Sequence, residues 1–394
     1  MRVVNSSMYR KFTSGVNNAH ANLIKSYNKV SSGEAYEKAA ENPLAHYRGK
    51  KIDDQFQESL AKTTLIKDVK NRLYQQELGA YDIQTTLAAA KNQVQRCRTG
   101  TTSDEALMTL RDDLLQKMHT VVNDLNAQYE NFYVFGGNDI STSPFSLSAD
   151  GTTLTFNHKY PGEQNVTTIT MKLTENADGT WSYKDAGISG TTYDSNGNAV
   201  TLNAAQAKEK LLTAMKEQGR MDLGYGSIHD RSTLMDTYTG GLNVLTGLNS
   251  DAVIAGAGDP ATDPNGKDIL DYLNESAVAL IGQAVLSVDS YKASGTGDKT
   301  QLYDVLGKTI EQMTQTEHTI STVYSDLGNK YKALDDTQTK MKKVQDSMQE
   351  QYNDLLGADP YMAIMEMFNN QYSYNAALQV GSNLMNTSLF DFMR

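Results

Sequence analysis

One feature constrains the fold of this chain more than any other: an apolar residue recurs every seven positions through a long stretch without proline. The series is Met313, Ile320, Leu327, Leu334, Met341, Met348 and Leu355. Such a sustained heptad repeat predicts a long helix with a continuous apolar seam. The sequence "GADP" at 357–360 ends this helix, because glycine suits a helix C-terminus and proline cannot continue a helix. Three tyrosines each follow a seam residue by four places: Tyr324, Tyr331 and Tyr352.

A second stretch without proline, 44–143, carries two further helical patterns. In the first, mostly apolar residues follow one another in steps of three and four. They are Ile66, Val69, Leu73, Gln76, Ala80, Ile83, Leu87, Ala90, Val94 and Cys97. The second pattern consists of Leu107, Leu110, Leu114, Met118, Val121, Leu125 and Phe132. Ser103 or Asp104 provides an N-cap for the second helix, and "RTG" at 98–100 fits the break between the two.

Both ends of the sequence carry shorter amphipathic patterns. The N-terminal one contains Tyr9, Phe12, Val16, Ala19, Leu23 and Val30. The C-terminal one contains Ile364, Phe368, Gln371, Leu378, Met385, Leu389 and Phe392, and the chain closes on the apolar "NTSLFDFMR". An isolated amphipathic helix is only marginally stable in water. We therefore expect these two helices to pair with each other or with other subunits, and the closing residues to belong to a subunit interface.

The region between these helical stretches, about 136–300, is rich in Gly, Thr, Ser, Asn and Asp, and its pattern alternates with a period of two. "NVTTITMKLTENADGTWSYKD" reads as two strands joined by an Asn-Ala-Asp-Gly turn, and "TTYDSNGNAVTL" reads as a hairpin around Asn196–Gly197. Two short helices are expected near 203–218 and 267–287. This region is predicted to be a β-rich domain inserted between helices.

The predicted fold class is therefore mainly α with an inserted β-rich domain, in which both chain ends build a long antiparallel helical rod or coiled coil. Five segments follow from this reading: a terminal helix (1–48), the N-terminal half of the rod (49–135), the inserted α+β domain (136–300), the C-terminal half of the rod (301–359) and a second terminal helix (360–394).

The sequence offers little for catalysis or metal binding. The six histidines are scattered, with no metal-ligand spacing. Cys97 lies at a seam position and is predicted to be a small core side chain rather than a nucleophile. The acidic loop 258–268 departs from the calcium-loop pattern and favours an Asx/Pro turn. We predict no catalytic, cofactor-binding or metal-binding residue, and no enzyme activity.

Charge and composition narrow the class of partner. The net charge is −11, and residues 136–294 alone hold 10 Lys/Arg against 19 Asp/Glu, a net of −9. Such a surface disfavours nucleic acid, and the mildly basic segment 1–50 holds no dense Lys/Arg cluster. No apolar run is long enough for a membrane helix, so no membrane insertion is expected. With no cleavable secretory signal at its start and one cysteine, the chain is expected to be cytosolic or exported without signal cleavage.

Four passages of the sequence resemble passages shared by one protein family and its superfamily. "NKVSSGEAYEKAAENPLAHYRGKKID" (28–53) is similar to the "LSSG…DDP" signature of the superfamily, with Glu41–Asn42 replacing two Asp before Pro43. "YENFYVFGGNDISTSPF" (129–145) is similar to the "YxFGG…PF" passage of the family, and "MDLGYG" (221–226) followed by "LNVLTGLN" (242–249) to its middle domain. "NTSLFDFMR" matches the usual ending of the family. On these passages the chain resembles the hook-associated protein 3 family, within the bacterial flagellin superfamily. Flagellins have Ala at the position of Pro43 and lack "FGG" and "SLFDF", and hook-associated protein 1 is longer.

The resemblance implies a flagellin-like fold and a structural role in the bacterial flagellum. Family members form an adaptor ring at the hook–filament junction, between hook-associated protein 1 and flagellin. Their implied partners are these two proteins, copies of the same chain and an export chaperone. They are exported through the flagellar channel without signal cleavage and lie outside the cell. The implied assembly-interface residues in this sequence are Tyr9, Phe12, Val16, Leu23, Val30, Pro43, Leu378, Met385, Leu389, Phe390 and Phe392.

Two alternatives stay open at this point. The chain could be a flagellin, the subunit of the filament itself. It could also be a soluble coiled-coil binding module, such as an adhesin or an export chaperone, with the β-rich domain as its recognition surface. In such a module the terminal helices should be ordered and protected in the monomer, whereas in a junction subunit they should not.

Overall fold

The computed structural model describes residues 2–217, 219–222, 234–295 and 297–392, without the side chains of 2–6, 222, 234 and 384–392. The chain divides into two compact units, each described by itself. The first unit holds residues up to Leu65 and from Gln338 onward, and the second holds Ile66–Thr337. The long helices of the chain are α1 (Arg2–Ser32), α2 (Pro43–Cys97), α3 (Asp104–Leu125), α9 (Thr300–Leu356) and α10 (Pro360–Phe392).

Within the unit 66–337, α2 and α9 run antiparallel along the predicted seams. All ten α2 residues of the predicted pattern, from Ile66 to Cys97, are buried. On α9, the seam residues from Met313 to Leu334 are buried as well. Lys70 and Asp335 form an ion pair across the two helices, with Nζ 2.8 Å from Oδ1. The antiparallel helical pair predicted from the sequence is confirmed.

Segment 136–300 contains the predicted β-rich region, a five-stranded antiparallel sheet in the order β3-β4-β5-β6-β7. Its strands are β3 (Phe145–Leu147), β4 (Thr153–His158), β5 (Thr167–Glu175), β6 (Trp181–Tyr193) and β7 (Ala199–Leu202). Both predicted hairpins are present: β5 turns into β6, and β6 into β7, where Tyr193 pairs with Ala199. Gly197 takes the left-handed conformation (φ 81°) that this turn requires. The fold class, mainly α with an inserted β-rich domain, is confirmed.

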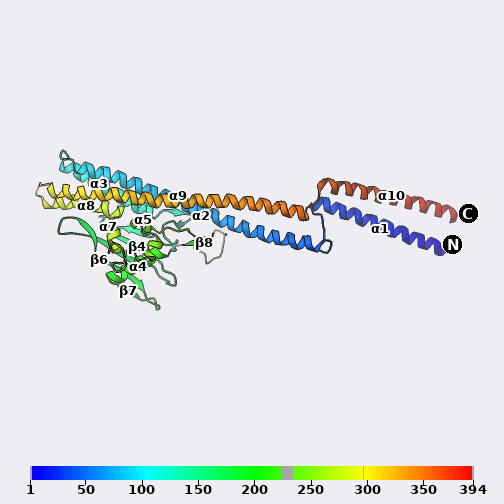
Figure 1. Ribbon diagram of the computed structural model, residues 1–394, viewed down its shortest axis with the longest axis horizontal. Coiled ribbons are helices and arrows are strands. Elements are labelled where there is room, and N and C mark those ends of the chain that lie inside the picture. Colours follow the sequence, from blue (N-terminus) through cyan, green and yellow to red (C-terminus); the bar gives the residue numbers. More distant parts are fainter. Residues whose placement is uncertain (1, 218, 223–233, 296, 393–394) are drawn as a thin grey trace. The chain divides into compact units, whose positions relative to one another are not determined.

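The sheet shares its core with the helices. The remaining described elements are α4 (Ala204–Lys216), β8 (Arg220–Asp222), β9 (Leu234–Asp236), α5 (Gly241–Thr246), α6 (Ser250–Ile254), α7 (Ile269–Asn274) and α8 (Ala277–Ser294). Helix α8 is buried on nearly all sides and lies beside α3 (Figure 1). A Cβ added at Gly282 of α8 would lie 2.7 Å from Leu173 of β5 and 2.9 Å from Met118 of α3. The glycine therefore lets α8 pass between the sheet and α3, so that one continuous core joins them.

Three local predictions differ from the structure. Helix α3 ends at Leu125 rather than continuing to Phe132, whose side chain is 46% exposed. Instead β1 (Gln128–Tyr129) and β2 (Phe132–Tyr133) form a hairpin, with Glu130 and Asn131 at positive φ in the turn. The helix expected at 267–287 is two helices, because the Ser276 hydroxyl accepts a hydrogen bond from the Ala279 amide and caps α8. Helices α5 and α6 were not predicted.

Other predicted helix boundaries are confirmed. The Ser103 side chain accepts from the Ala106 amide and caps α3. Asn203 caps α4, whose bounds 204–216 lie within the predicted 203–218. Helix α9 ends at Leu356 and α10 begins at Pro360, as "GADP" indicates. The five-segment division of the chain itself stays a prediction, although the shared core shows that the sheet does not pack alone.

In the unit that holds both chain ends, α1 and α10 lie side by side (Figure 1). The break between α1 and α2 lies next to the break between α9 and α10. The Ala35 amide donates to the Leu356 carbonyl (2.7 Å), and the Ala358 amide donates to the Gly33 carbonyl (2.8 Å). Glu34 and Gly357 thereby form an isolated antiparallel bridge. The two helix breaks are joined at the same level.

Candidate assembly interface

Helices α1 and α10 pack through a narrow face that combines small residues with half-buried Met367, Asn370 and Tyr374 of α10. On α10, Ala363 and Gly381 are buried, and Ala377 on the same face is half-buried. On α1, the predicted interface residues Phe12, Val16 and Leu23 are half-buried, as their spacing of four and seven along one helix face requires. The structure thus brings these three side chains together on the inner face of the pair.

Polar contacts fix the register of the pair. Lys29 Nζ lies 2.9 Å from Glu366 Oε2, and the side-chain amide of Asn370 donates to the Asn22 carbonyl (3.3 Å). The rings of His20 and Tyr374 lie 5.2 Å apart. Because the ion pair is partly exposed, its contribution to stability is small.

The predicted apolar stripe of α10 does not face α1. Ile364, Phe368 and Leu378 are 42%, 59% and 45% exposed, and Gln371 is exposed too. The face one residue earlier in each turn packs instead: Ala363 is buried, and Met367, Asn370 and Ala377 are half-buried. The large side chains of the predicted stripe lie on the outer surface, where the described residues of the unit leave them largely uncovered.

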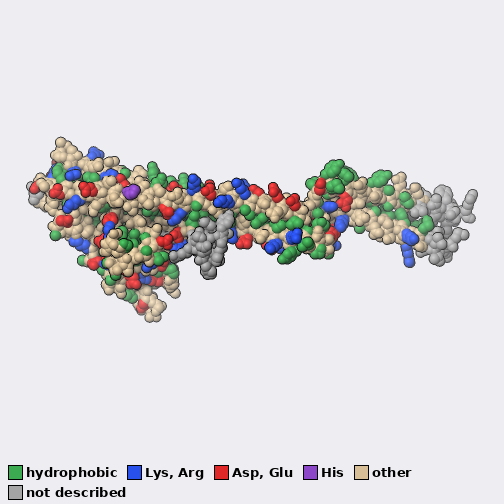
Figure 2. Space-filling model, viewed as in Figure 1, with side chains coloured by type: hydrophobic (Ala, Val, Ile, Leu, Met, Phe, Trp, Pro, Cys, Tyr) green, Lys and Arg blue, Asp and Glu red, His purple; other side chains and the backbone are tan. Residues whose placement is uncertain are grey.

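Helix α1 adds to this outer apolar surface. Tyr9 and Val30, which the sequence placed on the packed stripe, are exposed, at opposite ends of the helix. Figure 2 shows hydrophobic side chains gathered over the beginning of α10. We call the following exposed set the outer apolar surface: Met8, Tyr9, Ile24, Tyr27, Val30, Leu44, Tyr47, Tyr361, Met362, Ile364, Met365, Phe368, Tyr372, Leu378 and Val380.

Ten of the fifteen residues of this surface lie outside the two predicted stripes. Met8, Ile24 and Tyr27 on α1, like Tyr361, Met362 and Met365 on α10, fall outside the stripe chosen in each helix. The available signal was their number: these helices are apolar around more of their circumference than one packed stripe needs.

The side chains of Met385, Leu389, Phe390 and Phe392 lie outside the described residues. The backbone of these four residues continues α10 to Phe392. Their place in the interface stays a proposal.

Pro43 begins α2 and is exposed. The preceding Asn42 accepts a hydrogen bond from the Ala45 amide (3.1 Å), so it caps the helix and Pro43 occupies the first helical turn, where a proline fits. Glu41 pairs with Lys25 at 2.7 Å, which lowers the pKa of Glu41 through the side-chain hydrogen bond. Because Asn caps a helix as well as Asp does, the "ENP" sequence keeps both the cap and one ion pair.

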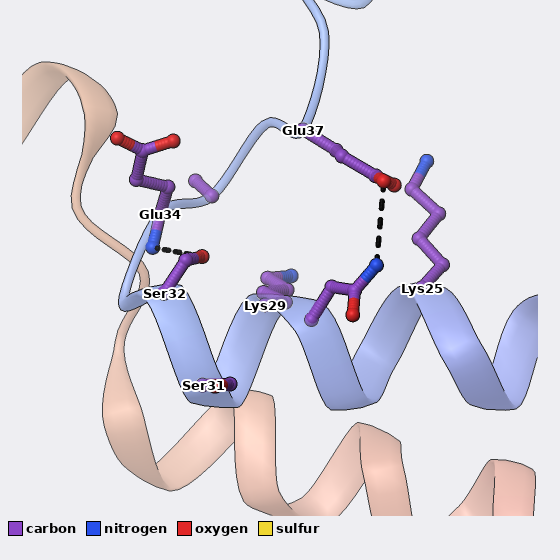
Figure 3. A pocket seen from close by; sticks show the side chains of 8 residues that line it. Lys25, Lys29, Ser31, Ser32, Glu34 and Glu37 are labelled. Carbon is purple, nitrogen blue, oxygen red and sulfur yellow. Dashed lines mark hydrogen bonds between the residues drawn. The ribbon is translucent and has the colours of Figure 1, made fainter.

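A polar pocket of about 320 Å³ lies beside this turn (Figure 3). Lys25, Lys29, Glu34 and Glu37 line it, with Ser31 and Ser32. The Asn28 side-chain amide donates to Glu37 (3.3 Å), and the Glu34 amide donates to the Ser32 hydroxyl (3.1 Å). Lys25 and Lys29 pair with Glu41 and Glu366, which do not line the pocket, so its lysines are engaged in ion pairs that hold the surrounding structure.

Two features of the sequence that were candidates for chemistry, Cys97 and the acidic loop 258–268, have structural roles. Burial raises the pKa of the Cys97 thiol to about 11, which keeps it protonated and unreactive. In loop 258–268, Asp263 accepts hydrogen bonds from the amides of Gly258, Asn265 and Lys267, and these bonds lower its pKa to about 2. The loop is held by its own backbone. Across the described ranges, no three His, Cys, Asp or Glu side chains are grouped to hold a metal ion.

Comparisons with known proteins gave matches in structure only. No family model matches the chain, and no curated protein matches it in sequence. Similar solved structures include a flagellar hook-associated protein of Vibrio parahaemolyticus (11% identity, 80% of this chain and 100% of that one, TM-score 0.49). FlgL of Bacillus cereus is 14% identical over 75% and 97% of the two chains, with a TM-score of 0.35. Hook-associated protein 3 of Legionella pneumophila is 12% identical over 78% and 98%, with a TM-score of 0.34.

The structural neighbours of the chain are thus hook-associated proteins from several species. None of the helices in the described ranges combines the length and apolar character needed to span a bilayer.

Proposed function

We propose that this chain is a structural subunit of the bacterial flagellum that joins hook to filament. In this role it forms an adaptor ring between hook-associated protein 1 and flagellin, contacts further copies of itself, and leaves the cell through the flagellar export channel with the help of a chaperone. Its function is mechanical, and no catalytic step is assigned to it.

The observation that carries this proposal is the outer apolar surface, which α1, α10 and the start of α2 share. Large side chains such as Phe368 and Tyr372 are exposed on it, and hydrophobic side chains gather over the beginning of α10 (Figure 2). Large exposed apolar patches on a protein mark sites of association. The four sequence passages that resemble the hook-associated protein 3 family agree with this reading, and two of them include the helices concerned.

Association through this surface supplies what the pair lacks alone. Burying one Leu or Phe side chain is worth about 1.5–3 kcal/mol, so a handful of such residues in an interface outweighs the marginal stability of two isolated helices. Ordering that is completed only on binding suits a subunit that has to remain unassembled during transport.

Deletion of the gene in its own organism tests the proposal. We expect completed hooks without filaments and flagellin monomers in the culture medium, because the filament has no adaptor to grow on. A plasmid copy should restore filaments and clear the medium of flagellin.

The same experiment separates the alternatives. If the chain were flagellin, the deletion would remove the main filament protein from the medium as well. If it were a coiled-coil binding module, filaments would still form on the hooks, and the proposal would be wrong.

A further inference from the structure

Two pairs of tyrosine rings meet between α2 and α9 in the unit 66–337. The rings of Tyr74 and Tyr331 are 5.8 Å apart between centroids, with 44° between their planes. Those of Tyr81 and Tyr324 are also 5.8 Å apart, at 57°. Across the ranges that the structure describes, these are the two places where one tyrosine ring packs against another. Both α9 members belong to the tyrosine series that follows the heptad seam.

The register of the helices explains why the pairs repeat. Because α2 and α9 are antiparallel, seven residues forward on α2 correspond to seven residues back on α9. Both pairs therefore lie on one side of the seam, above buried residues such as Leu73 and Leu327. Between the two pairs the Glu77 carboxylate lies against Gly328, where an added Cβ would lie 2.9 Å from Oε1.

The rings are packed and yet accessible. Tyr74 and Tyr81 are 45% and 50% exposed, and their partners are half-buried. The centroid distances fall within the ~4.5–7 Å of packed aromatic pairs, so adjoining ring edges are in contact. A small one-electron oxidant in solution can reach each pair, and the packed seam beneath keeps the two rings together.

We propose that Tyr74–Tyr331 and Tyr81–Tyr324 are sites of oxidative cross-linking, at which a peroxide-driven one-electron oxidant joins the two rings into dityrosine. Each phenol loses one electron and one proton, giving two tyrosyl radicals. The radicals combine by a carbon–carbon bond between ring positions ortho to oxygen, and the hydrogen on each joined carbon then moves to oxygen to restore the phenol. The pair loses two hydrogen atoms in all, and these reduce one hydrogen peroxide to two waters.

Proximity directs the coupling to these pairs. Groups held in contact react at an effective concentration far above the micromolar concentration of a dissolved protein. A radical formed on Tyr74 or Tyr331 therefore meets its partner before it meets another chain. The product is an intrachain bond between helices far apart in sequence. Such a link constrains the unfolded chain as a disulfide does, in a protein whose one cysteine is buried.

Treatment of the full chain at micromolar concentration with hydrogen peroxide and a haem peroxidase tests the proposal. We expect dityrosine fluorescence in a product that stays monomeric. Peptide mass spectrometry should find 74 linked to 331 and 81 linked to 324, each linked pair lighter by two hydrogen atoms. The cross-linked chain should melt at a higher temperature than the untreated one.

Matched variants make the test specific. The double variant Tyr324→Phe with Tyr331→Phe should form no monomer that contains dityrosine. Tyr331→Phe alone should still form the 81–324 link. Tyr361→Phe with Tyr372→Phe removes two of the more exposed tyrosines and should leave both links unchanged. The proposal is overturned if the main products are cross-linked dimers, or if the fluorescence disappears with Tyr361 and Tyr372 instead, because exposure rather than pairing would then decide the reaction.

Discussion

The ring of Phe12 on α1 packs directly over Gly381 on α10. A Cβ added at Gly381 would lie 2.1 Å from Cζ of Phe12, closer than any real contact. A glycine at this point costs α10 helix stability, since glycine is about 1 kcal/mol less favourable than alanine inside a helix. The contact with Phe12 offsets that cost by letting the two helices approach.

Replacing Gly381 by Ala should therefore loosen the α1–α10 pair despite the better helix former. The ring of Phe12 must move away, and we expect the helical circular dichroism of the protein to decrease. Gly15→Ala is the matched control, because nothing lies within 4 Å of a Cβ added at Gly15. That variant should gain up to about 1 kcal/mol of helix stability. Equal effects of the two changes would show that the Phe12–Gly381 contact does not hold the pair.

Substitutions on the outer apolar surface should impair assembly without affecting folding. Phe368→Ser with Leu378→Ser alters exposed side chains, so the melting temperature of the free protein should change by less than two degrees, as expected for roughly 0.5 kcal/mol or less. The same variant should fail to support filaments in the deletion strain, as seen by electron microscopy. Normal filaments together with normal melting would exclude this face from the interface.

The closing residues of the chain extend this prediction. Replacing Leu389, Phe390 and Phe392 by Ser should leave melting nearly unchanged while flagellin accumulates in the medium. Three apolar side chains lost from an interface remove on the order of 5–8 kcal/mol, and about 5.5 kcal/mol already moves an equilibrium from mostly joined to mostly apart. A variant that unfolds outright would instead place these residues in the core of the monomer.

Hydrogen exchange of the free subunit should divide the chain by helix. Residues 1 to about 45 and 361–394 should exchange rapidly, because the small face between α1 and α10 buries few large side chains. Residues 60–130 and 305–355 should be protected by the seam of α2 and α9. Slow exchange at both ends of a verified monomer would favour the self-contained binding module.

Asp124 near the end of α3 gives the free energy of unfolding a dependence on pH. Burial, and then the charge of Asp82, raise the pKa of Asp124 to about 6. At pH below about 4 the carboxyl is protonated in the folded and the unfolded chain, and no stability is lost. As the pH rises from about 4 to 6 the unfolded chain ionises first, so stability falls, and the loss is complete above about pH 6.

Asp124→Asn should remove this loss. Because the group is partly exposed, we expect a gain on the order of 1–2 kcal/mol at pH 7 and almost none at pH 3.5. Asp82→Asn, which relieves only the charge, should give a smaller gain. Denaturant unfolding of the original protein and the two variants at pH 7 and pH 3.5 measures these gains. An equal gain in the free energy of unfolding of Asp124→Asn at the two pH values would disprove the pH dependence.

The long seams were predictable because burial on them is nearly complete. From Ile66 to Cys97 each position of the pattern faces the core, so the sequence period and the packed face coincide. The β-hairpins followed from their turns, since Asn196–Gly197 favours the backbone that the turn needs. The turn at Glu130–Asn131 carried no glycine, so periodicity wrongly extended α3 to Phe132.

The candidate interface was predicted only in part. Reading α10 by its largest residues selected Ile364, Phe368 and Leu378. The packed face instead contains Ala363, Met367, Asn370, Tyr374, Ala377 and Gly381. A single sequence records which residues are apolar but does not record which partner covers them. Apolar side chains that are exposed in the single chain therefore resemble core residues in sequence, and only the structure distinguishes the two.

The bridge between Glu34 and Gly357 has a mechanical consequence. The segment that follows α1 and the segment that precedes α10 are joined by backbone hydrogen bonds at this bridge. A pull on α1 alone is passed through two backbone hydrogen bonds to the start of α10, so tension divides between two covalent paths instead of unwinding one. Because the bridge holds the two non-helical links to each other, a bend between the helices on either side has to involve both links at once.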